Sequence, residues 1–458
     1  VYRYPESAVD VFLKMHAYAE NLELLQETPP DTPAAFQPQT SNARQLIDQA
    51  FRKRRLKLNE SEAKQLLAFY DIPTAPHQIV QTETAAVAAA KDIGLPVVLK
   101  LLSPELTQKT TVNGVQLNVQ TLTEVKAAYK HLQEVIEKEG LGQVVEGILV
   151  EKMMEKPHEL LLGAKKDAVF GPVILFGKGG VAVEVFEDIS VGLPPLNMVL
   201  ARHILEKTKA FRLLQGYRGL PQIDVEQLQF LLCKFAYMVM DFPEIQEIDI
   251  NPFAIDENGG VVLDAHILLD QHATRRPKQR HHHLVISPYP SEYVKAAQLK
   301  DGTPIMLRPI RPEDEPLEQE LFHYLSEKTI YFRFFGYLPQ LTHDMLARFT
   351  QIDYDRELAI VAEIEQDDKR RLIGVVRLIA DAWNEKAEYA IVVADDYQGQ
   401  GIGNMLTNYI FEIAKERGIR KIYASVLAGN DRMLYLFERR GFIRRKEDFE
   451  TYYVEKEL

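Results

Sequence analysis

The sequence contains hardly any cysteine or tryptophan. Its 458 residues include one cysteine, Cys233, and one tryptophan. A single thiol excludes an intramolecular disulfide bond and a cluster of thiolate ligands for a metal. Cys233 lies in an apolar stretch with helical spacing, so we expect it to belong to a core. Because such a composition is typical of a reducing compartment, we expect a cytoplasmic protein.

Long apolar runs and an excess of basic residues are also missing. No stretch is long enough to span a bilayer and no signal-peptide pattern is present, which predicts no membrane association. The formal net charge of −12 argues against general nucleic-acid binding. With 46% hydrophobic and 26% charged residues the chain has the composition of a globular protein, and its length predicts two or three domains.

The first 39 residues combine a predicted helix with a proline-rich linker. Apolar residues recur at helical spacing through residues 1–28, and four prolines follow between residues 28 and 39. Proline stiffens a linker and disfavours helix. We therefore expect residues 1–39 to be the last helix of an upstream domain and a linker.

Residues 40–270 alternate helical and strand patterns. Asn59 is a predicted helix N-cap, and residues 177–180 form a glycine-rich turn. The predicted helices cover residues 40–57, 123–138, 197–214 and 225–240, besides the one that starts at Asn59. The predicted strands cover residues 97–101, 114–119, 147–154, 159–164, 173–176, 245–252 and 261–264.

Four features of this region occur in a particular order: a lysine on a strand, a Glu-x-Met segment, the glycine-rich turn and an Asp-x-Asn-Pro segment. This order resembles the ATP-grasp domain of the NDP-forming acyl-CoA synthetases. The resemblance implies that ATP or ADP binds here with Mg²⁺, whose ligands would be oxygen atoms. It implies Lys100, Glu151, Met153 and Glu159 as nucleotide-binding residues and Asp249 and Asn251 as magnesium ligands. Asp249 has the alternative role of a turn residue before a proline.

The sequence departs from the active synthetases at three places. Gln108 stands where they carry a histidine, and glutamine cannot take or relay a phosphoryl group. Thr110 and Thr111 replace an aspartate, and Gly192 replaces an arginine. We therefore expect this domain to have lost ligase activity.

Residues 271–299 form a predicted second linker. It is rich in basic residues and contains His281, His282 and His283 in a row. Adjacent side chains of an extended chain point to opposite faces, so three consecutive histidines do not converge on one metal ion.

Residues 300–458 predict a mixed, mostly antiparallel sheet with helices on both faces. Within it, an apolar strand at residues 389–394 is followed by Gln398-x-x-Gly401-x-Gly403 and a helical pattern that ends at Gly418. Glycines let backbone N–H groups approach an anion, and the helix dipole favours negative charge. The spacing fits neither the dinucleotide fingerprint nor a P-loop, since no lysine follows.

This turn resembles the pyrophosphate-binding motif of the GNAT acetyltransferases. A second segment, Asn430-x-x-Met433-x-x-Leu436 followed by Gly441-Phe442, is similar to the second signature of that family. The resemblance implies that acetyl-CoA binds to Ile391, Val392, Val393, Gln398, Gly399, Gln400, Gly401, Ile402, Gly403, Asn404 and Asn430.

Acetyl transfer to an amine requires a base, because the amine must be neutral to attack. Glu388 precedes the turn by the interval at which histone-type GNAT members carry their catalytic glutamate. At the edge of an apolar strand we expect its pKa to be raised. Alternatively, Glu388 is a solvated glutamate at the start of a strand. Glu385 is then the nearest substitute base. Phe437 stands where many members carry a tyrosine acid, and Tyr435 falls on another helix face.

The fold class is thus α/β (α+β), with an ATP-grasp-like domain followed by a GNAT domain. The combination resembles the C-terminal half of Pat-type bacterial protein lysine acetyltransferases. This resemblance implies that the protein acetylates lysines in metabolic enzymes such as AMP-forming acetyl-CoA synthetase. It also implies that the protein forms a homo-oligomer. Three alternatives remain: an NDP-forming acyl-CoA synthetase with an accessory GNAT domain, a small-molecule amine acetyltransferase and a non-catalytic acetyl-CoA sensor.

Overall fold

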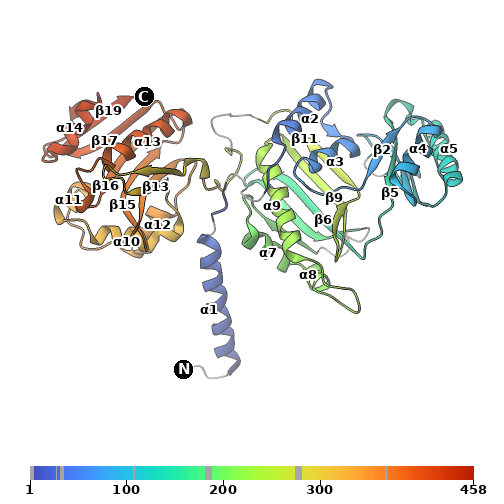
Figure 1. Cartoon of the computed structure of the whole chain (residues 1–458), viewed down its shortest axis with the longest axis horizontal. Helices are drawn as coiled ribbons and strands as arrows, with labels where there is room; N and C mark the ends of the chain where they lie inside the picture. The colour runs from blue at the N-terminus through green and yellow to red at the C-terminus, as the bar shows by residue number, and fades with distance from the viewer. Residues whose placement is uncertain are drawn as a thin grey trace. The chain divides into compact units, whose positions relative to one another are not determined.

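The computed structural model describes residues 5–26, 28–30, 36–106, 109–180, 188–273, 281–366 and 369–458. The chain forms two compact units (Figure 1). One consists of Val1–Thr32, Arg276–His282 and Ser287–Leu458, and the other of Pro33–Arg275 and His283–Ile286. In the described residues no helix is long and apolar enough to cross a membrane. The sheets of both units are mostly antiparallel, as the sequence predicts for residues 300–458.

A seven-stranded antiparallel sheet is the centre of the unit that contains Pro33–Arg275. Its order is β1-β11-β9-β6-β7-β8, with β10 paired to β9. The strands are β1 (Lys57–Leu58), β6 (His158–Asp167), β7 (Gly171–Lys178), β8 (Ile189–Gly192), β9 (Ile245–Asp256), β10 (Gly259–Val262) and β11 (Ala265–Leu269). The helices are α2 (Thr40–Arg52), α3 (Glu60–Ala68), α7 (Met198–Glu206), α8 (Lys209–Leu214) and α9 (Val225–Asp241).

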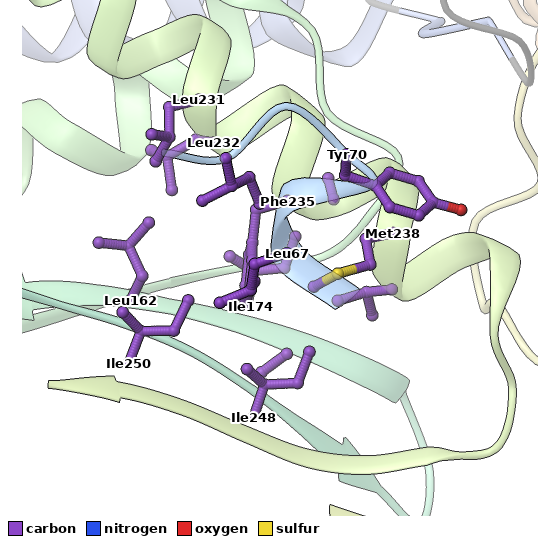
Figure 2. Packing of buried hydrophobic residues seen from close by; sticks show 14 of the residues in the cluster. Leu67, Tyr70, Leu162, Ile174, Leu231, Leu232, Phe235, Met238, Ile248 and Ile250 are labelled. Atoms are coloured by element: carbon purple, nitrogen blue, oxygen red, sulfur yellow. The ribbon is translucent and has the colours of Figure 1, made fainter. Parts of the chain in front are cut away.

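The core of this unit lies between helix α9 and the sheet. Phe235 and Met238 of α9 lie close to Leu67 of α3 and above Ile174 and Ile248 of the strands (Figure 2). Residues 235–240 of α9 are all buried, as expected for a helix segment that is apolar on all its faces. The cysteine is confirmed as a core residue: it is 5% exposed, and burial raises the pKa of the Cys233 thiol to about 12.

Several element boundaries in this unit differ from the expectation, most clearly at three places. The helix predicted for residues 197–214 is broken, because Thr208 caps α8 and the carboxylate of Asp188 accepts from the N–H groups of Lys209 and Ala210. The strand predicted for residues 261–264 ends at Val262, and the additional strand β11 pairs with β9. Helix α2 ends before residue 57, since Arg54 has a φ of +55°.

The same unit contains a second, four-stranded antiparallel sheet. Its order is β2-β5-β3-β4. The strands are β2 (His77–Val80), β5 (Gly147–Lys152), β3 (Val97–Leu102) and β4 (Val115–Val119), and the helices are α4 (Glu83–Ile93) and α5 (Leu122–Lys138). All residues of β3 are buried, which brings the ammonium group of Lys100 into the interior.

The other unit contains an eight-stranded sheet with the order β12-β13-β14-β15-β16-β17-β19-β18. The strands are β12 (Lys295–Gln298), β13 (Pro304–Pro309), β14 (Glu357–Gln366), β15 (Lys369–Ala380), β16 (Lys386–Val393), β17 (Lys421–Leu427), β18 (Ile443–Lys446) and β19 (Thr451–Glu457). The helices are α10 (Glu315–His323), α11 (Glu327–Phe334), α12 (His343–Thr350), α13 (Ile402–Arg417) and α14 (Asp431–Arg439), together with α1 (Pro5–Gln26) near the start of the chain.

Two further predictions concern residues before position 300. The helix expected in residues 1–28 is present as α1. Strand β12 lies within residues 271–299, where we expected a linker, and it pairs with β13. The basic residues predicted in that linker occupy positions 274–280, which lie outside the described residues.

Side chains alternate between the two faces of strand β16. Tyr389 lies on the α13 face, where its ring contacts Phe411 and Phe437 and its hydroxyl shares a 2.8 Å hydrogen bond with Thr407. The opposite face carries Glu388 and the cross-strand neighbours of β15, among them Arg377, which pairs with a carboxylate of α10. The base predicted from the sequence therefore lies on the α10 face.

Candidate functional site

Strands β16 and β17 separate where the predicted base lies. They pair in parallel from Lys386 opposite Lys421 to Glu388 opposite Tyr423, and pairing ends there. Strand β16 nevertheless remains paired with β15 as far as Val393. The backbone of residues 389–393 on the β17 side thus borders a wedge between strands. Three of the predicted acetyl-CoA residues, Ile391, Val392 and Val393, are partly buried along this wedge.

The glycine-rich turn presents backbone donors at the N-terminus of α13. Gly399 and Gly401 have φ values of +82° and +98°, a region that suits glycine. Throughout the described residues no acceptor faces the N–H groups of residues 399–404. A Cβ at Gly399 would meet nothing within 4 Å, so the turn is open to a ligand. Such donors at a helix N-terminus form a site for a phosphate group.

Two cations that the motif does not contain flank this turn. A Cβ built on Gly401 would lie 3.2 Å from Cε of Lys300, which belongs to the β12–β13 turn. Arg432, at the start of α14, donates from Nη1 to Oε1 of Gln398 at 2.8 Å. Neither cation has a carboxylate partner in the described parts of the chain. Sequence reasoning missed both, because Lys300 is separated from the turn by about a hundred residues that only the fold brings back.

We predict that Lys300→Met raises the KM for acetyl-CoA about three- to tenfold and leaves kcat unchanged, because an exposed cation near a phosphate contributes about 1 kcal/mol. Steady-state kinetics at low and at high salt would measure this effect, which salt should weaken. Lys415→Met, on the last turn of α13 and therefore far from the glycine-rich turn, is the control. An unchanged KM in Lys300→Met would show that this cation does not contact the cofactor.

Other predicted side chains stabilise the turn rather than face the wedge. Gln398 donates from Nε2 to the carbonyl of Val393 at 3.1 Å, and Gln400 donates to the carbonyl of Asp396 at 3.0 Å. Asn404 accepts from Nη2 of Arg440 at 2.9 Å. The N-cap of α14, formed by the side chain of residue 430, accepts from the backbone of residue 433 at 3.2 Å. Their side chains thus hold the loop in place, and the backbone N–H groups are the donors available to a ligand.

Glu388 is solvent-exposed, which corrects the expectation that it lies in an apolar setting. Its β15 neighbour is Ile379, and its β17 neighbour is Tyr423. Burial and, next, the charge of Glu388 raise the pKa of Tyr423. The substitute base, Glu385, lies at the strand entry, where its carboxylate is 3.5 Å from Arg420. Only Glu388 therefore lies beside the point of strand separation.

The structure offers no acid at the family's tyrosine position. Phe437 is 1% exposed and packs against Tyr389 and Phe442, so its place belongs to the core. Tyr435, at 60% exposure, lies on another face of α14, as the sequence indicated.

The second candidate site is a buried cluster of charges in the other unit. The carboxylate of Glu60 accepts from Nζ of Lys64 at 2.8 Å, of Lys100 at 2.9 Å and of Lys109. Glu151 pairs with Lys64 at 2.7 Å and with Lys100 at 3.0 Å. Burial opposes the charged form of Glu60, but the lysines together hold the pKa of Glu60 well below its usual range.

Lys100 is fully engaged in this cluster. An ammonium group has three donors, and those of Lys100 face Glu60, Glu151 and the carbonyl of Leu263, the last at 2.8 Å. Burial opposes its charged form, but Glu60 and Glu151 raise the pKa of Lys100. The N–H of Met153, predicted to face a nucleotide base, donates to the carbonyl of Pro96 at 3.1 Å. A phosphate on Lys100 would therefore have to replace a carboxylate.

Strand β9 brings the remaining predicted residues together. Oδ1 of Asn251 accepts from the N–H of Gly180 at 2.8 Å, and a Cβ at Gly180 would collide with the carboxylate of Glu159. Asp249 lies two positions earlier on the same face of β9, and burial raises the pKa of its carboxyl group. Among the described residues no group of three or more His, Cys, Asp or Glu side chains is arranged for a metal. The asparagine and aspartate oxygens suit Mg²⁺ that phosphates also ligate.

Of the positions at which the sequence departs from the synthetase pattern, Gly192 is described by the structure and Gln108 is not. A Cβ at Gly192 would collide with Cδ1 of Ile204 on α7, so the packing of this helix leaves no room there for the arginine of the synthetase pattern.

Comparisons with known proteins match both halves of the chain. Residues 49–269 match the ATP-grasp domain family, and residues 323–442 match the acetyltransferase (GNAT) family. The β subunit of ADP-forming acetate–CoA ligase I from Pyrococcus furiosus is 31% identical over 229 residues, which are 50% of this chain and 98% of that subunit. An acetyltransferase of Pseudomonas aeruginosa is 32% identical over 149 residues, 32% of this chain and 80% of that protein.

Longer ligases match the same half. ADP-forming 4-hydroxybutyrate–CoA ligase from Nitrosopumilus maritimus is 32% identical over 258 residues, 56% of this chain. The chain spans 36% of that ligase, about a third of its length.

Proposed function

Since this chain belongs to the family of the ADP-forming acetate–CoA ligase β subunits and to the GNAT acetyltransferases, we propose that it joins two acetyl-CoA-dependent activities. Residues 300–458 would transfer an acetyl group from acetyl-CoA to an amine, and residues 40–270 would bind ATP or ADP with Mg²⁺. The observation that carries the first activity is the row of N–H groups at residues 399–404, which have no acceptor in the described part of the chain and lie beside separated strands. These donors are suited to the pyrophosphate of acetyl-CoA.

In the acetyl transfer, a neutral amine attacks the thioester carbonyl. Glu388 takes the proton that the amine loses, and a backbone N–H of β16 beyond Glu388 donates to the oxyanion. The C–S bond then breaks, and the departing thiolate takes a proton from solvent, since no tyrosine stands at the family's acid position. The exposed position of Glu388 suits an acceptor that arrives from solvent.

The comparisons favour an ADP-forming acyl-CoA ligase module over the inactive module that we expected from Gln108 and Gly192. The reaction would convert acetyl-CoA, ADP and phosphate into acetate, CoA and ATP. Glu159, Asp249 and Asn251 would hold the nucleotide and Mg²⁺, which neutralises phosphate charge when bound.

Luciferase detection of ATP from acetyl-CoA, ADP and phosphate, with the complete protein, would test this ligase activity. Continuous ATP formation that stops in Asp249→Asn would support it. Tight ADP binding without ATP formation would favour the nucleotide-binding but inactive module.

We further propose that the acceptor is the Nε group of a lysine in a metabolic enzyme, AMP-forming acetyl-CoA synthetase being the first candidate. Trp383, the tryptophan noted above, is 79% exposed in the β15–β16 turn, and Ile379 beside Glu388 is 41% exposed. Exposed aromatic and aliphatic side chains next to a reacting group are typical of a protein-binding surface. A relative that is a ligase subunit also supports association with further subunits.

We predict that Trp383→Ala lowers acetylation of the protein acceptor about tenfold or more, the usual effect of losing an interface tryptophan. Acetylation of a short lysine peptide should be unaffected. Transfer of radiolabel from acetyl-CoA to AMP-forming acetyl-CoA synthetase would measure the effect, with Phe449→Ala, at 94% exposure in another loop, as the control. An equal loss with both acceptors would contradict a docking role.

A further inference from the structure

A pocket lies on the face of the C-terminal sheet that carries Glu388. Arg333 of α11, Arg348 of α12, Glu357 of β14, and Arg377 and Ile379 of β15 contribute to its lining. Glu357 is the cross-strand neighbour of Ile379, and Ile379 is that of Glu388, so the three side chains lie in one row. The pocket therefore begins one strand away from the base.

Two of its three guanidinium groups have carboxylate partners. Arg348 pairs with Glu357 at 2.9 Å. Arg377 pairs with Glu318 of α10 at 3.0 Å and donates to the carbonyl of Phe349 at 2.6 Å. Both cations are thus held in place and neutralised by the protein.

Arg333 is different. It is partly buried, and no carboxylate in the described portion of the chain lies within ion-pair distance of its guanidinium group. Burial and the neighbouring Arg377 lower the pKa of Arg333 to about 10, against the smaller opposing effects of Glu318 and Glu388. Arg333 hence remains charged at neutral pH. An unpaired cation in a partly desolvated pocket is stabilised by an anion that enters it.

The anion that fits is a carboxylate. The planar guanidinium group presents parallel donors to a carboxylate. The apolar lining from Ile379 and Phe349 suits the methylene groups of an amine's side chain. Because the charge of Glu388 acts on Arg333, a molecule with an amine at Glu388 and a carboxylate at Arg333 would span two opposite charges of the protein.

We propose that this pocket binds a carboxylate of the acceptor, with Arg333 as its partner, so that the preferred acceptors are amines that carry a nearby carboxylate. This inference rests on the proposed acetyl transfer and names the class of its acceptor. The carboxylate has two possible sources, the acid group of a small amino acid or a glutamate near the acceptor lysine of a protein.

Two matched pairs of acceptors distinguish these sources. One pair is 6-aminohexanoate and 6-aminohexanamide, and the other is the blocked peptides Gly-Lys-Gly-Glu-Gly and Gly-Lys-Gly-Gln-Gly. In the complete protein we expect the carboxylate member of one pair to have a kcat/KM roughly ten- to hundredfold above its neutral partner, as a charged hydrogen bond supplies. The pair that shows the preference identifies the source. Arg333→Met should remove the preference and leave the neutral member within about twofold of wild type.

Lys328→Met removes a charge from an exposed position of the same helix and should keep the preference. Equal kcat/KM values within both pairs in the wild type would overturn the proposal, and so would an equal loss for both members in Arg333→Met. Calorimetric titration with glutarate keeps the pocket testable if no amine is acetylated. Binding to the wild type but not to Arg333→Met would then support the carboxylate site while the transferase proposal fails, and absence of binding would overturn the site.

Discussion

Replacing Glu388 with glutamine should lower kcat for acetyl transfer about 10²- to 10⁴-fold, the usual contribution of a general base. Glutamine keeps the size and polarity of the side chain but cannot accept the proton that the attacking amine must lose. The KM for acetyl-CoA should stay near its wild-type value, because the turn at residues 399–404, which we propose as the cofactor site, follows the opposite end of β16. Steady-state transfer of labelled acetyl groups to a lysine acceptor would measure both constants.

Glu385→Gln is the matched control, since Glu385 lies three residues earlier and its carboxylate faces Arg420. It should leave kcat within about twofold of the wild type. The opposite pattern, with a loss in Glu385→Gln and none in Glu388→Gln, would transfer the role of base to Glu385. Unchanged rates in both variants would indicate that solvent removes the proton.

The strand, turn and helix of the proposed acetyl-CoA site could be predicted from the sequence because these elements are consecutive. A strand, a glycine-rich turn and a helix N-terminus are local features, and Gly399, Gly401 and Gly418 have the left-handed backbone that their glycines suggested. Local patterns were misleading for Glu388, which we expected in an apolar setting and which is exposed. Its neighbours are apolar, but a strand turns successive side chains to opposite faces, so burial of Tyr389 does not bury Glu388.

The pocket that we propose for the acceptor could not be predicted, because its residues come from separate elements. Arg333, Arg348 and Arg377 belong to α11, α12 and β15, and only the tertiary fold brings them into one pocket. The same holds in the other unit. The lysine of β3 lies on the predicted strand, but its partner Glu60 comes from a helix 40 residues earlier. No local pattern indicates that this lysine already has carboxylate partners.

Replacing Glu60 with glutamine should lower the free energy of unfolding of its unit by about 3–5 kcal/mol, the range for removing one partner of a buried ion pair. The side chain of Glu60 is 1% exposed. Removing its negative charge would leave the buried positive charges of Lys64, Lys100 and Lys109 with fewer carboxylate partners. Scanning calorimetry or urea unfolding of the complete chain would measure this, with the transition of each unit followed separately because the chain need not unfold in one step.

The destabilisation caused by Glu60→Gln should become smaller as the pH falls. The folded-state pKa of Glu60 lies well below that of the unfolded chain, which is about 4.3. Its stabilising contribution is therefore complete above that value and is lost as the pH falls toward the folded-state pKa. The wild type and Glu60→Gln should accordingly differ most near neutral pH and approach each other in acid.

Glu62→Gln, on the same helix, is the comparison that isolates burial. Glu62 also pairs with a cation, Arg55 at 2.5 Å, but its side chain is 23% exposed. Glu62 also forms a capping box with Asn59 at the start of α3. Loss of the ion pair and weakening of this capping box should lower stability by about 1–2 kcal/mol. Equal effects of the two substitutions would show that the buried lysines lose their charge when Glu60 is removed. A larger effect at Glu60 would show that the three buried lysines together depend on this carboxylate.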